Sequence, residues 1–396
     1  MALESPLASH WDLDPEVTFL NHGSFGGCPR AVLAHQRELQ REMEREPVRF
    51  LARELEGRLD AARAALAAFV RCDADDLAFV PNATAGVNTV LRSLAFAPGD
   101  ELLTIDQEYN ASRNALDFVA ARSGARVVTA PIPFPIAAPQ QVVDSVLAHA
   151  TPRTKLLLID HITSPTGLVL PIAEIVGKLA ERGIDTLVDG AHGPGMVPLD
   201  LDALGAAYYT GNCHKWLCTP KGSALLHVRR DRQAAIRPLA ISHGANATRT
   251  DRSRFRLEFD FTGTADYTPF LCIPTALRVL GELLPGGIAA LQQHNRDLAR
   301  AGRDRLCAAL RIPAPAPDAM LGSLAAVPLP PCAEPCDAMG RDPLQAHLFD
   351  DHGIEVPVMR WARPPLLLLR IAAQAHNTVA QFERLAELAA AWHPGR

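Results

Sequence analysis

The chain has 396 residues, of which 48% are hydrophobic, and its formal net charge is −5. A chain of this length can bury a large core and is typical of two domains. Its slight negative charge excludes the broad basic surface by which proteins attract nucleic acid.

The N-terminal sequence lacks the basic and apolar regions of a secretion signal, and no apolar run approaches the ~18 residues of a membrane helix. The eight cysteines are scattered along the chain, which is typical of reduced cytosolic thiols rather than of a disulfide framework. Cys332 and Cys336 lie in a Pro-rich stretch with too few further ligands for zinc. We expect a cytoplasmic protein without a metal, a nucleic-acid partner or a membrane partner.

Apolar segments of strand length alternate with longer amphipathic segments over most of the chain. The expected strands span residues 17–21, 77–80, 101–105, 126–132, 154–161, 185–192 and 206–212. The expected helices span residues 32–44, 55–70, 84–96, 111–124, 140–150 and 172–183. This alternation predicts an α/β fold with a mostly parallel central sheet and helices on both faces.

The last third of the chain has a different pattern. Residues 242–270 are polar and lack a helical period, so we expect surface loops there. Pro285 and the two glycines after it mark a break, and a long helical pattern follows. Further strand-like and helix-like segments predict a smaller α+β C-terminal domain. We divide the chain into an N-terminal segment over the active site, a large domain and a small domain, at 1–30, 31–270 and 271–396.

Only four lysines occur in the chain, at positions 155, 178, 215 and 221. A desolvated lysine amine can form a Schiff base with a carbonyl group, whereas arginine stays protonated. Lys178 lies in an amphipathic helical pattern, Lys155 begins a strand and Lys221 lies in a Pro-Gly turn, so surface positions explain these three. Lys215 follows an expected strand in a mostly uncharged stretch, and is the candidate nucleophile.

An acidic residue, Asp189, ends the expected strand that precedes this one. A helix N-cap is the alternative role for it, but a parallel sheet binds ligands beyond the C-terminal ends of its strands, where Lys215 also falls. Ala83 and Thr84 join a strand to a helix through small residues, and the free N–H groups of such a helix start suit a phosphate. A phosphate site, a carboxylate for a pyridinium and a lysine for an aldehyde together predict pyridoxal 5'-phosphate (PLP).

Motifs spread over almost the whole chain carry a resemblance to a known family. They read "FLNHGSFGGCPR", "PNATAGVNTVLRSL", "DQEYNASRN", "DHITSPTGLVLPI", "VDGAHGPG", "TGNCHKW", "FTGTADYTPF" and "LRIAAQAHNT". In these motifs the sequence resembles the class V aminotransferase family of fold type I PLP-dependent enzymes, and within it the isopenicillin N epimerase-like branch.

The resemblance implies roles around the cofactor. Lys215 would form the Schiff base, Asp189 would pair with the ring nitrogen, and His192 would reach the ring hydroxyl. Phosphate contacts would come from Ala83, Thr84, Asn212 and His214.

Further cofactor contacts follow from the same resemblance. Tyr109 would stack on the ring, where relatives often carry histidine, and Ser164 stands where many relatives have asparagine near the ring. Gly263 and Thr264 resemble the segment that reaches the phosphate of a neighbouring subunit, which implies a homodimer with shared active sites.

Arg370 resembles the arginine that binds the α-carboxylate of the substrate, and a guanidinium matches a carboxylate in a bidentate way. A surface charge at a strand end is the alternative. Asn21 and His22 belong to the segment that resembles the one covering the substrate.

The resemblance leaves the reaction open. No cysteine occurs in residues 353–370, before the carboxylate-binding arginine, so persulfide chemistry is not expected. Epimerisation and C–S β-lyase chemistry on an amino acid rank first, and transamination ranks lower. Epimerisation needs a second proton donor, for which Tyr109, His22 and His376 are candidates. A non-catalytic PLP-fold binding or regulatory protein is the alternative from another class.

Overall fold

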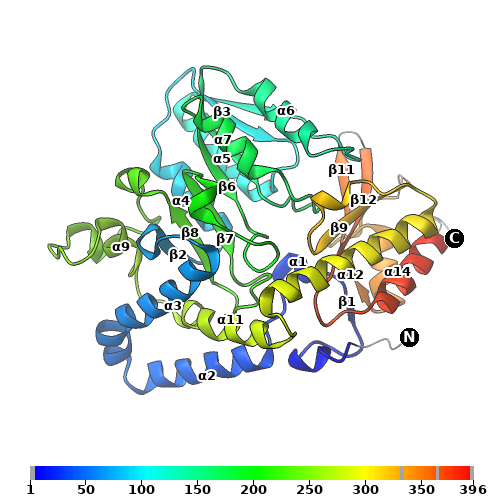
Figure 1. Ribbon diagram of the computed structural model, residues 1–396, viewed down its shortest axis with the longest axis horizontal. Coiled ribbons are helices and arrows are strands. Elements are labelled where there is room, and N and C mark those ends of the chain that lie inside the picture. The colour runs from blue at the N-terminus through cyan, green and yellow to red at the C-terminus, as the bar shows by residue number, and fades with distance from the viewer. Residues whose placement is uncertain (1–4, 331–333, 363–364, 393–396) are drawn as a thin grey trace.

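The computed structural model describes residues 5–330, 334–362 and 365–392, so Cys332 lies outside the described residues. A large region is built around a seven-stranded sheet, and a smaller region with the C-terminal strands lies beside it (Figure 1). The first strand and helix run next to the C-terminal strands, although they lie at the other end of the sequence.

The seven-stranded sheet has the order β2-β8-β7-β6-β5-β3-β4. Its strands are β2 (Leu77–Val80), β3 (Glu101–Ile105), β4 (Arg126–Ala130), β5 (Thr154–Asp160), β6 (Asp185–Asp189), β7 (Tyr208–Asn212) and β8 (Ala224–Val228). All pairs from β7 to β4 are parallel, and only β8 runs antiparallel to its two neighbours. The prediction of a mostly parallel sheet is confirmed.

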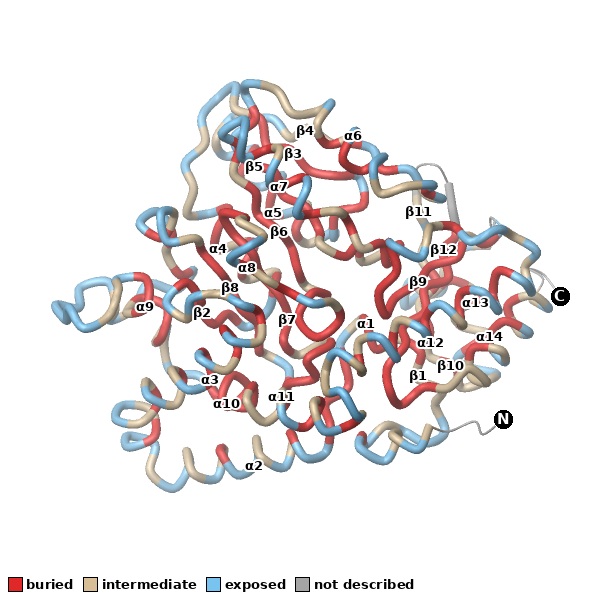
Figure 2. The backbone as a smooth tube through the Cα atoms, in the orientation of Figure 1, coloured by how far each residue is buried: buried red, intermediate tan, exposed pale blue. Residues whose placement is uncertain are grey.

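Helices cover both faces of this sheet, so its strands are almost wholly buried except for the edge strand β4, which is partly exposed (Figure 2). Neighbouring residues of one strand belong to different apolar clusters, for example Leu157 and Leu158 of β5. This follows from the alternation of side chains along a strand. The helices of the large region are α2 (Arg30–Arg45), α3 (Leu55–Val70), α4 (Ala83–Ser93), α5 (Asn110–Ser123), α6 (Gln140–His149), α7 (Ile172–Ala180), α8 (Leu201–Leu204), α9 (Arg254–Phe259), α10 (Thr268–Leu271) and α11 (Ile273–Glu282).

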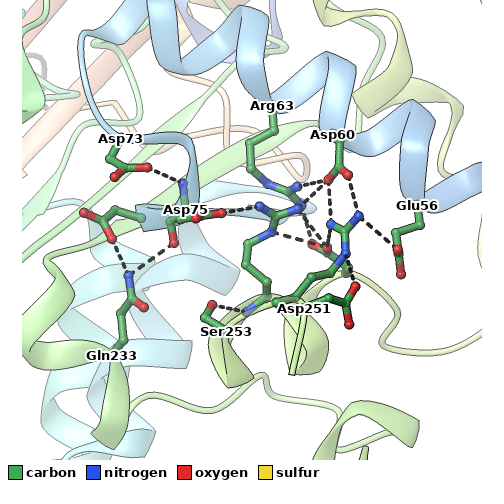
Figure 3. A network of polar contacts seen from close by, with 12 residues as sticks. Glu56, Asp60, Arg63, Asp73, Asp75, Gln233, Asp251 and Ser253 are labelled. Atoms are coloured by element: carbon green, nitrogen blue, oxygen red, sulfur yellow. Dashed lines mark hydrogen bonds and ion pairs between the residues drawn. The ribbon is translucent and has the colours of Figure 1, made fainter. Parts of the chain in front are cut away.

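The polar stretch 242–270 is not wholly loop, as the sequence had predicted, because it contains α9. Ion pairs with α3 and with the turn before β2 hold this short helix (Figure 3). Arg256 contacts Asp60 at 2.5 Å and Asp75 at 2.7 Å, and Arg63 pairs with Asp260. These ion-pair partners lie far away in the sequence, so no local periodicity of the sequence predicts this helix.

The smaller region has a three-stranded antiparallel sheet of order β11-β12-β9, which packs against two helices. Its elements are α12 (Gly287–Leu310), β9 (Leu324–Leu329), α13 (Pro343–Asp350), β10 (Ile354–Glu355), β11 (Val358–Ala362), β12 (Pro365–Ala372) and α14 (Val379–Ala391). The N-terminal β1 (Thr18–Phe19) pairs with β10, and α1 (His22–Phe25) follows it.

The domain boundaries stay predictions, but packing favours a later one than residue 270. α11 buries Ile273 and Leu280 in the cluster of the large region, whereas α12 contributes Leu298 and Leu306 to the cluster of the smaller region. The break before Gly287 therefore separates the two cores better.

Among the described residues, no single helix combines the length and the apolar composition of a membrane span. Thr268–Glu282 and Gly287–Leu310 meet these criteria only together, as a pair bent by 68°.

Candidate active site

Lys215 lies in the loop that follows β7, and its amine points toward the loop that follows β6. Its Nζ is 3.2 Å from Nε2 of His192. Burial, together with the positive charge of Arg370, lowers the pKa of Lys215 to about 8, although Asp189 and Asp160 act in the opposite direction. An appreciable fraction of this amine is therefore neutral, and hence nucleophilic, at physiological pH.

The N-terminal segment packs directly against the backbone of this lysine loop. Gly26 has a φ of +72°, and a Cβ there would come within 2.3 Å of the carbonyl oxygen of His214 and 2.8 Å of that of Lys215. Only glycine fits this close approach. The lysine is thus held by a segment almost 200 residues earlier in the chain.

His22 takes part in this packing rather than in an open pocket. Its ring is fully buried, its Nδ1 accepts a hydrogen bond from the N–H of Gly27, and its Nε2 donates to the carbonyl oxygen of Lys215 at 3.0 Å. Burial lowers the pKa of His22 to about 4. His22 therefore supports the backbone of the lysine loop, and its expected contact with substrate stays a prediction. His376 contacts His22 at 3.4 Å and shares this buried position.

Asp189 ends β6 and is almost fully buried. Its Oδ2 accepts a hydrogen bond from the hydroxyl of Ser112 at 2.7 Å, and its Oδ1 accepts one from the N–H of Ala191 at 3.0 Å. Burial raises the pKa of Asp189. The next helix begins only at Leu201, so Asp189 is not the helix N-cap that was its alternative role.

Two more buried carboxyl groups accompany Asp189, and the sequence had not singled them out. The oxygens of Glu108, Asp160 and Asp189 lie within 4.8 Å of one another. Oε1 of Glu108 and Oδ2 of Asp160 have no hydrogen-bond partner among the described residues. Burial and mutual repulsion raise the pKa values of Glu108 and Asp160 well above the usual range. Such a concentration of buried acid suits a cation held next to it, as a protonated pyridine nitrogen would be.

Three of the four expected phosphate residues meet where β2 leads into α4. The N–H of Ala83 donates to Oδ1 of Asn212 at 2.8 Å, so the start of α4 is tied to the end of β7. Nδ1 of His214 donates to the carbonyl oxygen of Ser223 at 2.9 Å, and burial lowers the pKa of His214 to about 4. Thr84 follows Ala83 and is partly exposed. Ala83, Thr84 and Asn212 therefore lie together at a helix start of the kind that binds phosphate.

Arg370 lies on β12 and is only 4% exposed, which excludes a surface charge. Its Nη1 donates to the carbonyl oxygen of Ser164 at 2.7 Å, and its Nη2 donates to Oγ of Ser24 at 3.0 Å and to Oδ1 of Asn21 at 3.3 Å. Its Nε is buried without a partner among the described residues. Burial lowers the pKa of Arg370 to about 10, so the group stays charged. Three segments distant in sequence thus meet at one guanidinium.

The remaining expected residues lie at the margin of this site. Tyr109 is 44% exposed at the start of α5, and it is close enough to Arg370 to affect its pKa. Gly263 is partly exposed and Thr264 is exposed, on the loop after α9. Thr264 lines a hollow with Leu55 of α3.

The fold and this site define a class of protein. The chain belongs to the class V aminotransferase family, because the family model described as aminotransferase class-V matches residues 27–336. Enzymes of this family use PLP, and the lysine, the buried acid and the helix start described above fit that cofactor. The predictions of the family, the fold class and the cofactor are confirmed.

Individual relatives indicate which branch of this family the chain resembles. The chain is 37% identical over 389 residues to the isopenicillin N epimerase of Amycolatopsis lactamdurans, which covers 95% of each chain. It is 29% identical over 407 residues to a probable chloroplastic L-cysteine desulfhydrase of Arabidopsis thaliana, covering 97% of this chain and 84% of that one. A solved structure of a C-DES mutant with glycine covalently linked to its PLP cofactor has the same fold, with a TM-score of 0.76 at 23% identity over 96% of this chain and 97% of that one. The resemblance to the isopenicillin N epimerase-like branch is confirmed.

Proposed function

We propose that this protein is a PLP-dependent enzyme that acts at Cα of an amino acid, either as an epimerase or as a C–S β-lyase. One observation carries the proposal: a buried lysine amine lies close enough to a buried cluster of carboxyl groups, and to a buried arginine, for their charges to act on its pKa. The relatives named above, an epimerase and a cysteine desulfhydrase, support the same two reactions.

When bound, the cofactor supplies an aldehyde for the amine and an electron-withdrawing ring that weakens the Cα–H bond. Lys215 would hold it covalently and, once freed, would move the proton at Cα as a general base. Asp189 would keep a positive charge on the ring nitrogen. The other proposed cofactor contacts are Ala83, Thr84, Tyr109, Ser164, His192, Asn212 and His214, with Gly263 and Thr264 contributed across a homodimer interface.

Arg370 would bind the α-carboxylate of the substrate. The guanidinium of Arg370 donates to two neutral acceptors, Ser24 and Asn21. The carboxylate of a substrate would replace these acceptors and form stronger, charge-assisted hydrogen bonds. The substrate would therefore be oriented between Arg370 and Lys215. The described cysteines are free thiols, which supports the cytoplasmic location that we also propose.

The two proposed reactions differ in one requirement: epimerisation needs a second proton donor. His22 is buried against the backbone of the loop that contains Lys215. Tyr109, at the exposed margin of the site, therefore remains as a candidate for this proton donor. Incubation of the pure enzyme with L-amino acids in deuterated water tests the proposal. Cα deuterium with inverted configuration would identify an epimerase, and release of pyruvate with sulfide from cysteine would identify the lyase. Accumulation of a keto acid with an aminated cofactor, and neither of these products, would contradict both.

Substitution of Arg370 by lysine is expected to raise KM for the amino acid by roughly tenfold to a hundredfold, with a smaller change in kcat. Lysine keeps the charge but loses the bidentate fork, and each ~1.4 kcal/mol of lost binding is a factor of ten. Steady-state kinetics measure this. Arg305→Lys is the matched control, because Arg305 forms an exposed pair with Glu383 and such pairs contribute ~0–1 kcal/mol. An unchanged KM in Arg370→Lys would exclude the carboxylate role.

A further inference from the structure

His192 lies between the indole of Trp216 and the amine of Lys215, and both contacts are hydrogen bonds. Nε1 of Trp216 donates to Nδ1 of His192 at 3.1 Å. On the other side of the ring, Nε2 of His192 is 3.2 Å from Nζ of Lys215. The imidazole therefore links a structural residue to the lysine.

The chemistry of the indole decides the protonation of this ring. An indole N–H can only donate, so Nδ1 of His192 must carry the lone pair. The neutral ring then has its proton on Nε2, and this N–H points at Lys215. Only a neutral amine can accept that hydrogen bond, since an ammonium group has no lone pair. Burial and the positive charges of Lys215 and Arg370 lower the pKa of His192 well below the usual range, which is consistent with a neutral ring.

The surroundings hold this arrangement in place. Trp216 is 1% exposed and packs in an apolar cluster with Ile162, Met196 and Leu324. Gly195, in the loop of His192, has a φ of +90°, and a Cβ there would come within 2.4 Å of the carbonyl carbon of Trp216. The backbones of the two loops therefore lie against each other, which fixes the position of Trp216 relative to His192.

We propose that Trp216 is a positioning residue: it fixes His192 as the Nε2–H tautomer, and His192 in turn favours the neutral, nucleophilic form of the Lys215 amine. The other charged groups that act on this amine are Arg370, which also favours the neutral form, and Asp189 and Asp160, which oppose it. The inference rests on the proposed role of Lys215, but it concerns the amine before the cofactor is attached.

Without the indole N–H, His192 can place its proton on Nδ1 and accept from a protonated Lys215. This new hydrogen bond would favour the charged amine, and a shift of one pKa unit corresponds to ~1.4 kcal/mol. Trp216→Phe keeps an aromatic ring and is therefore expected to raise the pKa of Lys215 by about one unit. Its reactivity at neutral pH should fall about tenfold.

The small number of lysines makes this measurable. The cofactor-free protein is labelled by reductive methylation across a pH series, and each lysine is quantified by peptide mass spectrometry. Lys155 and Lys178 lie in exposed ion pairs and serve as internal references. The expected wild-type midpoint for Lys215 is at about 8, and Trp216→Phe should move it upward by about one unit.

Two further variants distinguish a positioning role of Trp216 from a role in packing alone. Met196→Leu disturbs the same apolar cluster but keeps the indole N–H, and should leave the midpoint of Lys215 unchanged. In a His192→Leu background, Trp216→Phe should have no additional effect, because the link through the imidazole is already lost. An unchanged midpoint in Trp216→Phe, an equal shift in Met196→Leu, or a full shift without His192 would each overturn the proposal.

A direct observation remains decisive if Trp216→Phe does not fold. In wild-type protein with ¹⁵N-labelled histidine, the ring nitrogens of His192, assigned through His192→Leu, should show a protonated Nε2 and an unprotonated Nδ1. The reverse pattern would overturn the proposal. Neither measurement depends on turnover, so failure of the proposed function would appear separately, as a wild-type protein that forms no covalent link with PLP.

Discussion

Replacement of Lys215 by alanine is expected to abolish covalent attachment of PLP and to reduce turnover by roughly three orders of magnitude or more. The substitution removes both the Schiff-base amine and the proposed general base, and general acid–base catalysis alone contributes ~10²–10⁴-fold. The other lysines cannot replace it. Lys155 lies 3.8 Å from Asp100, Lys178 pairs with Glu174 at 2.6 Å, and Lys221 donates to the carbonyl oxygen of Gly26.

Borohydride reduction followed by mass spectrometry of the intact protein measures this link, and the absorbance of the bound cofactor gives a second measurement. Lys178→Ala is the matched control, since it removes a lysine from an exposed helix pair and should leave the adduct intact. A borohydride-stable adduct of the Lys215→Ala protein would show that another amine holds the cofactor.

The end of a parallel strand was the most informative position in the sequence. Lys215 and Asp189 were both predicted to lie near the active site because they follow neighbouring strands, and Asp189 of β6 is indeed paired in register with Thr210 of β7. The same rule, applied to the last residue of the next strand, would have found Asp160, which pairs in register with Asp189. The acidic cluster was therefore within reach of sequence reasoning.

Other features could not be predicted, because they depend on contacts between distant segments. The motif around His22 suggested a substrate contact, but its partner is the backbone of Lys215, and no sequence pattern encodes that packing. The hydrogen bond from Trp216 to His192 is similar, since a tryptophan after a lysine is most simply an apolar core residue. α9 is held by ion pairs with α3, nearly 200 residues earlier, and by Phe255 and Phe259, which pack in an apolar cluster of the large region.

Asp189→Asn is expected to lower kcat by roughly two to three orders of magnitude. Asparagine is nearly isosteric, and its Oδ1 can still accept from the N–H of Ala191. Its amide nitrogen, in the place of Oδ2, can donate to Oγ of Ser112, because a hydroxyl can also accept, so the local structure should persist. The substitution removes the charge opposite the ring nitrogen, and loss of one partner of a buried ion pair costs ~3–5 kcal/mol. Each ~1.4 kcal/mol corresponds to a factor of ten in rate. Steady-state kinetics and a PLP titration measure the effect.

The same substitution should stabilise the cofactor-free protein. The pKa of Asp189 is raised in the folded state, so the wild-type protein loses stability as the pH rises through that pKa. Below the ordinary carboxyl pKa of ~3.9, Asp189 is protonated in both the folded and the unfolded state. The stability gained through Asp189→Asn should therefore vanish at such a pH. Thermal unfolding of the cofactor-free variant should therefore occur at a higher temperature than in the wild type at neutral pH.

Asp185→Asn is the control at the opposite end of β6, where Arg232 pairs with Asp185. This control should not raise the unfolding temperature and should leave kcat unchanged. A variant at position 189 with wild-type kcat and a lowered unfolding temperature would mean that Asp189 is a structural acid with no role at the cofactor.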